Sequence, residues 1–147
     1  MLKRDSKGFT LIELLIVVAI IGIIAAIAIP NLLNAIDRGK QKRTMADMRS
    51  IGTAVESYAV DNNVYPVASD AATLVGFVQP IYIKTMPTAD GWNGTYQVAA
   101  IATQYTIHSF GKDGSGTTCT AGTTTLFNDE ICFVNGQFLR YPAGSQQ

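Results

Sequence analysis

The sequence predicts an α+β protein, in which one long N-terminal helix packs on a small antiparallel β-sheet. Three observations predict this fold: an apolar segment from Phe9 to Ile29, an amphipathic helical pattern that continues it to about Asp61, and short alternating segments in the last third of the chain. A helix followed by antiparallel strands is a layer arrangement in which each element buries its apolar face against the other.

Length and composition exclude two classes of protein. The chain has 147 residues, enough for one domain or for one domain with an appendage. Eleven Lys and Arg balance eleven Asp and Glu, so the chain lacks the positive field that holds nucleic acid, and we expect no nucleic-acid partner. An apolar share of 48% with only 15% charged residues is the opposite of a disordered composition.

The N-terminus has the pattern of a membrane-inserted segment. Lys3, Arg4 and Lys7 outweigh Asp5, and positive charge beside such a segment is retained on the cytoplasmic side. The 21 residues 9–29 are long enough, as a helix, to cross a hydrocarbon core of about 30 Å. We therefore expect a single-pass membrane protein with its start in the cytoplasm and the rest of the chain outside.

Composition leaves other interpretations of this segment open. An ordinary signal peptide would be cut at a small-x-small site, which Ala26-Ile27-Ala28 offers, but the helical pattern does not stop there. A plain membrane anchor explains the length but not Glu13, because a carboxylate in a membrane helix is costly unless it is paired or functional.

A third interpretation rests on a resemblance. The segment Lys7-Gly8-Phe9-Thr10-Leu11-Ile12-Glu13, followed by an apolar helix with Gly22 and Pro30, resembles the prepilin signature of the type IV pilin and type II secretion pseudopilin family. The resemblance implies that a membrane prepilin peptidase cuts between Gly8 and Phe9 and methylates the new amino group of Phe9. It divides the chain into a leader peptide at 1–8, a membrane and assembly helix at 9–34, and a segment at 35–147 that holds the rest of the helix and a globular head.

Glu13 has a physical role under this interpretation. Cleavage would create an amino group on Phe9, four residues before Glu13 and on the same helical face. Opposite charges in a poorly solvated core attract, although desolvation cancels much of the gain. The resemblance implies that Glu13 pairs with the Phe9 amine of a neighbouring subunit, and that the helix near Gly22 and Pro30 partly unwinds in filaments. A glutamate that simply extends to the membrane surface is the alternative.

The predicted helix is too long for the rest of the chain to cover. Apolar residues recur at helical spacing at Leu33, Ile36, Met48, Ile51, Val55 and Tyr58, and Asp61-Asn62-Asn63 with Pro66 supplies the stop. Such a helix is about 80 Å long, whereas the residues after it form a body of roughly 30 Å. Its first half must be buried in lipid before assembly and in other copies of the chain afterwards.

Charge is uneven along the chain. The helix segment from Asp37 to Arg49 carries a net charge of +3, and the residues from Asp61 onward carry −3. The two regions could attract each other between stacked copies. A solvated helix face or contact with anionic headgroups explains the same pattern.

The head contains one short helix and four predicted strands. Ser69 or Asp70 can cap a helix from Ala71 to Val78, which Pro80 ends. Strands are predicted at 96–102, 104–110, 131–134 and 137–141, the last two joined by the hairpin signal Asn135-Gly136. The segment 114–125, rich in Ser, Thr and Gly, is predicted to be a loop.

Cys119 and Cys132 form one candidate pair. With the lone His108 they are too few to hold a structural zinc, and His108 itself is expected to be an ordinary strand residue. A reduced pair in a cytosolic protein is one interpretation. The membrane-inserted N-terminus favours an oxidising compartment and a disulfide.

The head also resembles that of the major pseudopilins of type II secretion. The order of motifs from Asp61 to Pro66, from Met86 to Tyr96 and from Ser109 to Gly114 carries this resemblance. It implies a calcium ion held by Asp113, Asp129 and Glu130 together with carbonyl oxygens near Phe110. Many true pilins hold the same region with a disulfide loop instead, for which Cys119 and Cys132 are the candidates.

These patterns predict a structural protein, not an enzyme. The sequence contains neither a phosphate-binding Gly-x-x-x-x-Gly-Lys loop nor a Gly-x-Ser-x-Gly elbow. Our first hypothesis is a subunit that polymerises, after leader cleavage and N-methylation, into a type IV pilus-like filament in the periplasm or at the cell surface. The first alternative is a major pseudopilin of type II secretion; the second, of another class, is a secreted or membrane-tethered binding domain.

The expected partners follow from the filament hypothesis. They are further copies of the chain in a helical filament, the prepilin peptidase, the inner-membrane assembly machinery and the membrane itself. Calcium is the one cofactor that the resemblance implies.

Overall fold

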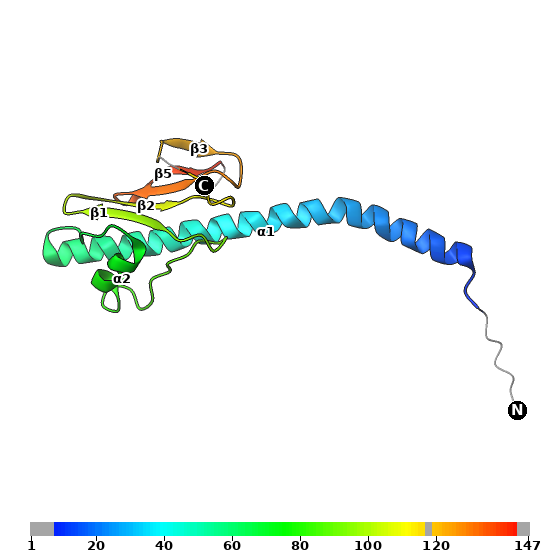
Figure 1. Cartoon of the computed structure of the whole chain (residues 1–147), viewed down its shortest axis with the longest axis horizontal. Helices are drawn as coiled ribbons and strands as arrows, with labels where there is room; N and C mark the ends of the chain where they lie inside the picture. Colours follow the sequence, from blue (N-terminus) through cyan, green and yellow to red (C-terminus); the bar gives the residue numbers. More distant parts are fainter. Residues whose placement is uncertain (1–7, 117–118, 144–147) are drawn as a thin grey trace, which may run out of the picture. The chain divides into compact units, whose positions relative to one another are not determined.

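The structure, a computed structural model, describes residues 8–116 and 119–143 (Figure 1). The leader charges Lys3, Arg4 and Lys7 lie outside the described residues. The chain consists of two compact units, Met1–Ile36 and Asp37–Gln147.

Helix α1 runs from Leu11 to Asn62, which confirms the long N-terminal helix. It ends where Asn63 adopts a left-handed backbone conformation, with Pro66 soon after. The helix continues through Gly22 and Pro30. The Asn31 side chain donates to the Ile27 carbonyl at 3.0 Å, next to the backbone hydrogen bond that proline cannot make.

The described part of the first unit is the N-terminal end of this helix. Its apolar side chains, from Leu11 to Ile36, are almost all exposed in the single chain. Within the described residues, α1 is the one helix long and apolar enough to cross a membrane. An apolar surface of this extent requires a non-aqueous environment or a partner.

The second unit contains a five-stranded sheet, in the order β1-β2-β4-β5-β3. The strands are β1 (Gln97–Ile101), β2 (Gln104–Ser109), β3 (Gly122–Thr124), β4 (Ile131–Val134) and β5 (Gln137–Pro142). The four predicted strands are confirmed, and the β4–β5 turn has positive φ at Asn135 and Gly136, as a two-residue hairpin requires.

Strand β3 corrects two predictions. Residues 122–124 were expected to be loop, yet they form a strand, and β3 pairs with β5 in parallel, so the sheet is mixed rather than antiparallel. A three-residue strand of Gly and Thr has no alternating apolar pattern. Its pairing depends on its place beside β5, which the local sequence does not show.

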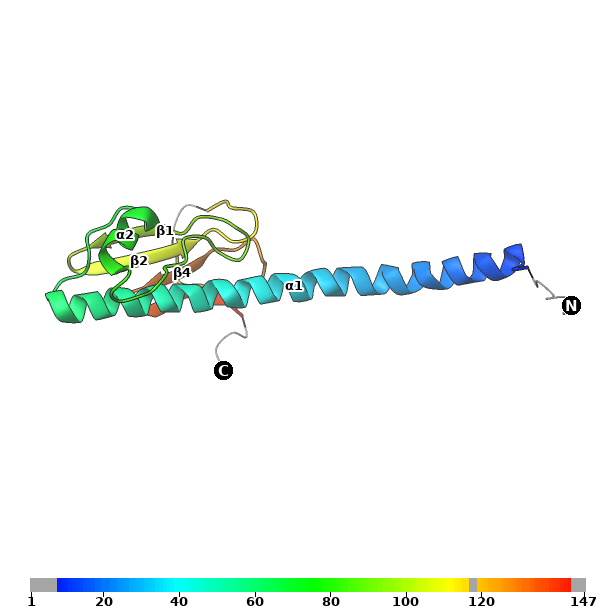
Figure 2. The same cartoon turned by 90° about the horizontal axis from the view of Figure 1, so that it is seen from below.

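The sheet packs on the C-terminal half of α1, and α2 (Ala71–Val78) packs near the end of α1 and against β1 (Figure 2). Asp70 caps α2, as predicted, by accepting from the Thr73 amide at 2.7 Å. The core is formed by apolar side chains from all of these elements: Met48, Ile51 and Val55 of α1, Leu74 and Val78 of α2, and Val98, Tyr105, Ile107, Ile131 and Phe133 of the sheet. The predicted helix positions Met48, Ile51 and Val55 are therefore confirmed as core.

Candidate functional site

The predicted processing site lies just before α1. Gly8 and Phe9 belong to no helix or strand, and Phe9 is 81% exposed. An exposed segment outside regular structure is where a protease reaches a backbone. Cleavage after Gly8 and methylation at Phe9 stay predictions.

Glu13 takes part in a capping box with Thr10. The Glu13 carboxylate accepts from the Thr10 amide at 2.9 Å and from its hydroxyl at 2.6 Å, while the Glu13 amide donates to the same hydroxyl at 3.3 Å. These bonds satisfy donors at the start of α1. We did not predict the role of Thr10 from the sequence, although the Thr-x-x-Glu spacing is the known signature of this cap.

At the start of the second unit, Asp37 joins α1 to two loops. Its carboxylate accepts from the Trp92 indole at 3.1 Å and from the Lys112 ammonium at 2.8 Å, and the residue is only 7% exposed. The hydrogen bond from Lys112, followed by that from Trp92, lowers the pKa of Asp37 below its ordinary value. From the sequence alone, Asp37 is only one of the charged residues of the helix segment from Asp37 to Arg49.

The loop that contains Trp92 is organised by Asp90. This buried carboxylate accepts from the Trp92 and Gly94 amides at 2.9 and 2.8 Å and from the Ser109 hydroxyl at 2.6 Å. The Gly91 amide donates to the Thr44 hydroxyl of α1, and a side chain at Gly91 would collide with the Lys40 backbone. The loop is therefore held directly against the helix.

Some of the charged residues between Asp37 and Arg49 of α1 have partners within the chain. Asp37 is engaged by Lys112, and Arg43 lies 3.6 Å from Asp47. Arg38, Lys42 and Arg49 are exposed cations. Which charges they meet in an assembly stays a prediction.

The C-terminal loop is closed by a disulfide between Cys119 and Cys132, which is present in the structure as predicted. Cys132 lies in β4, directly across from His108 of β2 and from Arg140 of β5. The loop is thus tied to the centre of the sheet. His108 is buried, and this burial lowers its pKa, against the opposing effect of Glu130.

The three predicted calcium ligands have separate partners. Asp113 accepts from the Ser115 amide at 3.0 Å, and Asp129 accepts from the Thr125 and Leu126 amides at 3.1 and 3.0 Å. Glu130 lies near His108 and Arg140. In the part of the chain that the structure describes, no three His, Cys, Asp or Glu side chains are placed to hold a metal ion. As arranged, these residues do not fit a calcium site.

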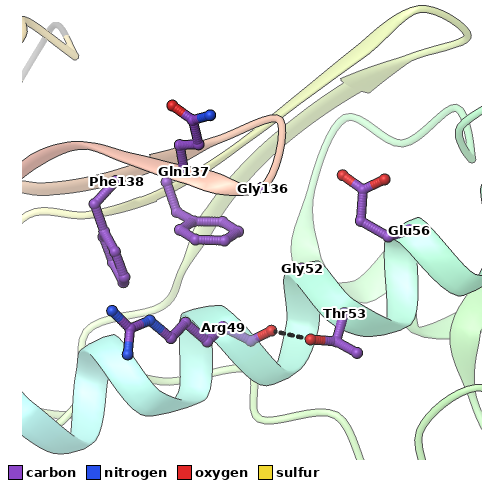
Figure 3. Close-up of a pocket in the computed structure, with 8 residues that line it drawn as sticks. Arg49, Gly52, Thr53, Glu56, Gly136, Gln137 and Phe138 are labelled. Atoms are coloured by element: carbon purple, nitrogen blue, oxygen red, sulfur yellow. Dashed lines mark hydrogen bonds between the residues drawn. The ribbon is translucent and has the colours of Figure 1, made fainter.

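A groove of about 600 Å³ lies between α1 and the β4–β5 hairpin (Figure 3). Its lining is Arg49, Gly52, Thr53 and Glu56 from α1 and Phe133, Gly136, Gln137 and Phe138 from the hairpin. The Arg49 guanidinium lies 5.1 Å from the centre of the Phe138 ring, a cation–π contact. The Tyr65 hydroxyl donates to the Glu56 carboxylate.

Comparison with known proteins places these features in a family. The prokaryotic N-terminal methylation motif matches residues 3–29, and the family description "Type II secretion system (T2SS), protein G" matches residues 31–125. The chain belongs to the type II secretion protein G family.

Similar members of the protein G family include the type II secretion system core protein G of Pseudomonas aeruginosa, 33% identical over 78% of this chain and 89% of that protein. The core protein G of Klebsiella michiganensis is 30% identical over 86% of this chain and 98% of its own length. A crystal structure of the major pseudopilin from the type 2 secretion system of enterohaemorrhagic Escherichia coli is 28% identical, covers 70% of this chain and 93% of its own, and has a TM-score of 0.49.

Membership of the protein G family changes the order of our hypotheses. The match to the methylation motif covers Gly8, Phe9, Glu13 and Gly22, and Pro30 directly follows it. The family's description names a part of a secretion apparatus, not an enzyme. The pseudopilin alternative is therefore better supported than the pilus subunit that we placed first.

Proposed function

We propose that this chain is the major pseudopilin of a type II secretion system, a structural subunit that works by polymerising. Membership of the protein G family carries the proposal, because relatives matched over most of their length are named as the core protein G of that system. The exposed apolar side chains of the N-terminal half of α1 support it, since only lipid or other copies would cover them.

The proposed sequence of events begins in the inner membrane. The leader 1–8 is removed, Phe9 becomes the methylated N-terminus, and the helix 9–34 moves from lipid into a bundle of identical helices. The segment 35–147 stays in the periplasm and forms the outside of the filament. The prepilin peptidase and the inner-membrane assembly machinery are the partners required for these steps.

In this proposal Glu13 sets the register between subunits. Thr10 satisfies its carboxylate in the single chain, and the Phe9 amine of a neighbour replaces or joins Thr10 on assembly. The attraction between the two charges is larger in a helix bundle than in water, and desolvation offsets much of it. The pair therefore selects a register more than it adds stability.

The mass of the mature protein tests the processing step. A chain that begins at Phe9 and carries one extra methyl group is expected. A mature chain that begins near Ile29 would have lost the assembly helix, and the proposal would then fail in favour of a secreted binding domain.

Deletion of the gene tests the secretion role against the pilus role. For a pseudopilin, exported proteins should accumulate in the periplasm while surface fibres remain. Loss of surface fibres with normal secretion would instead identify a pilus subunit. Restoration by the native gene is the control for both readouts.

A further inference from the structure

Arg140 contacts both arms of the disulfide loop, which are the segment that follows Cys119 and the segment that precedes Cys132. Residue 140 of β5 pairs with Cys132 of β4 on one side and with Gly122 of β3 on the other. Its Nη1 donates to the Thr120 hydroxyl at 2.9 Å and lies 3.8 Å from Glu130 Oε2. Thr120 follows Cys119 and Glu130 precedes Cys132 by two residues, so one guanidinium contacts both arms.

Glu130 is largely shielded from water and needs a compensating charge. Its side chain is 12% exposed, and that of Arg140 is 27% exposed. His108 Nε2 lies 3.3 Å from Glu130 Oε2, but histidine is charged only when it is protonated. The guanidinium of arginine is charged at every physiological pH. Arg140 is thus the permanent positive charge beside this carboxylate.

Gly116 lies against the same carboxylate. A Cβ at Gly116 would overlap Glu130 Oε1 and the Phe110 ring, so the backbone of Gly116 lies directly against Glu130. The Phe110 ring in turn packs edge-on against His108, with 4.5 Å between ring centres. Glu130 is therefore surrounded by Gly116, by His108 of β2 and by Arg140 of β5.

We propose that Arg140 supplies from within the chain the positive charge that holds Glu130, and that the disulfide loop is thereby fixed without a metal ion. A calcium ion would neutralise loop carboxylates and join the segments that carry them. Here the guanidinium neutralises Glu130 and reaches Thr120. Asp113 and Asp129 bind backbone amides instead. The disulfide adds covalent closure between the same two arms.

The test uses the full oxidised chain in detergent, as the native protein and as the variants Arg140→Gln, Arg140→Lys and Lys84→Gln. Lys84 is an exposed residue of the head, so Lys84→Gln controls for the loss of one positive charge. Each protein is measured with excess calcium and with excess EGTA, by thermal melting and by hydrogen exchange of the amides in residues 120–132.

The native chain should give the same melting temperature and the same exchange in calcium and in EGTA. Arg140→Gln should exchange about tenfold faster in the loop, since the shielded Glu130 carboxylate loses its ion-pair partner and Thr120 loses a charged hydrogen-bond donor. Arg140→Lys should lie in between, and Lys84→Gln should match the native chain.

Two results would overturn the proposal. One is a native chain that EGTA loosens and calcium restores, because an ion would then hold the loop. The other is an Arg140→Gln loop that exchanges no faster than that of Lys84→Gln. If Arg140→Gln does not fold, the comparison of native chain and Arg140→Lys in EGTA and calcium still decides between guanidinium and metal.

Discussion

Two carboxylates on α1 perform different tasks because their surroundings differ. Glu13 lies in the apolar segment with Thr10 as its partner, whereas Asp37 is buried at the start of the second unit between Trp92 and Lys112. The first has a neutral partner, which the Phe9 amine of a neighbour would replace or join under the proposed function. The second already has its cation and serves the fold of its own chain.

Two substitutions of Glu13 separate the role of its negative charge from its role in capping the start of α1. Glu13→Gln keeps the capping box, because glutamine fits the same position, but it removes the charge. Glu13→Ala removes both. Both variants should be processed and inserted, and both should form few filaments, which electron microscopy and processing assays measure. Normal filament yield from both would remove Glu13 from the assembly step.

Asp37 should make stability depend on pH. Its pKa is lower in the folded chain than in the unfolded one, so its contribution is complete above about pH 4 and disappears as the pH falls through the folded value. Asp37→Asn should cost about 1.5–3 kcal/mol at pH 7 and less at pH 3, by denaturant unfolding in detergent. Asp61→Asn is the control, because this position is exposed and asparagine can still accept from the Tyr82 hydroxyl. An equal loss at both pH values would contradict the ion pair.

At the level of elements, α1 is one helix with two kinds of surface. Up to Ile36 it is apolar and exposed, and beyond Asp37 it has a buried stripe facing the sheet. Beside the groove, the β4–β5 hairpin also makes a close contact with the helix. At this point Gly52 lies against the ring of Phe133, which is itself buried.

Two glycine substitutions in α1 should have opposite effects. Gly52→Ala would force a methyl group into the Phe133 ring and should cost about 1–3 kcal/mol by overpacking. Gly39→Ala has open space around it and should stabilise the helix by about 0.5–1 kcal/mol. Thermal melting of the two variants measures both. A neutral Gly52→Ala would mean that the hairpin can move away from the helix.

At the scale of the whole molecule, the N-terminal segment decides the redox environment of the rest. If the chain after the membrane helix is exported, Cys119 and Cys132 meet an oxidising compartment and can form the bond that the structure contains.

Reduction of the disulfide should destabilise the second unit. Closing the loop between Cys119 and Cys132, 13 residues apart, contributes roughly 3 kcal/mol in the loop-entropy description. The reduced chain should therefore melt several degrees lower than the oxidised chain, and native protein should contain no thiol that labels. Two reactive thiols in protein isolated from the periplasm, with an unchanged melting temperature, would show that the bond does not form there.

The sequence by itself determined the elements whose signals are local. Periodicity gave α1 its extent, and Ser69 or Asp70 located the start of α2. Asn135-Gly136 located the hairpin, and the segment from Lys7 to Glu13 pointed to the family. Each of these signals lies within a few residues of the feature it predicts, so no knowledge of distant contacts is needed.

Only the tertiary structure decided the features that join distant residues. The parallel pairing of β3, the link from Asp37 to Lys112 across 75 residues, and the position of Arg140 between Thr120 and Glu130 depend on how the sheet brings its strands together. In the described part of the chain, the predicted calcium ligands do not come together as a cluster. The family resemblance implied a calcium site, but Asp113 and Asp129 accept from backbone amides within four residues of themselves, and Glu130 lies beside His108 and Arg140 of the neighbouring strands.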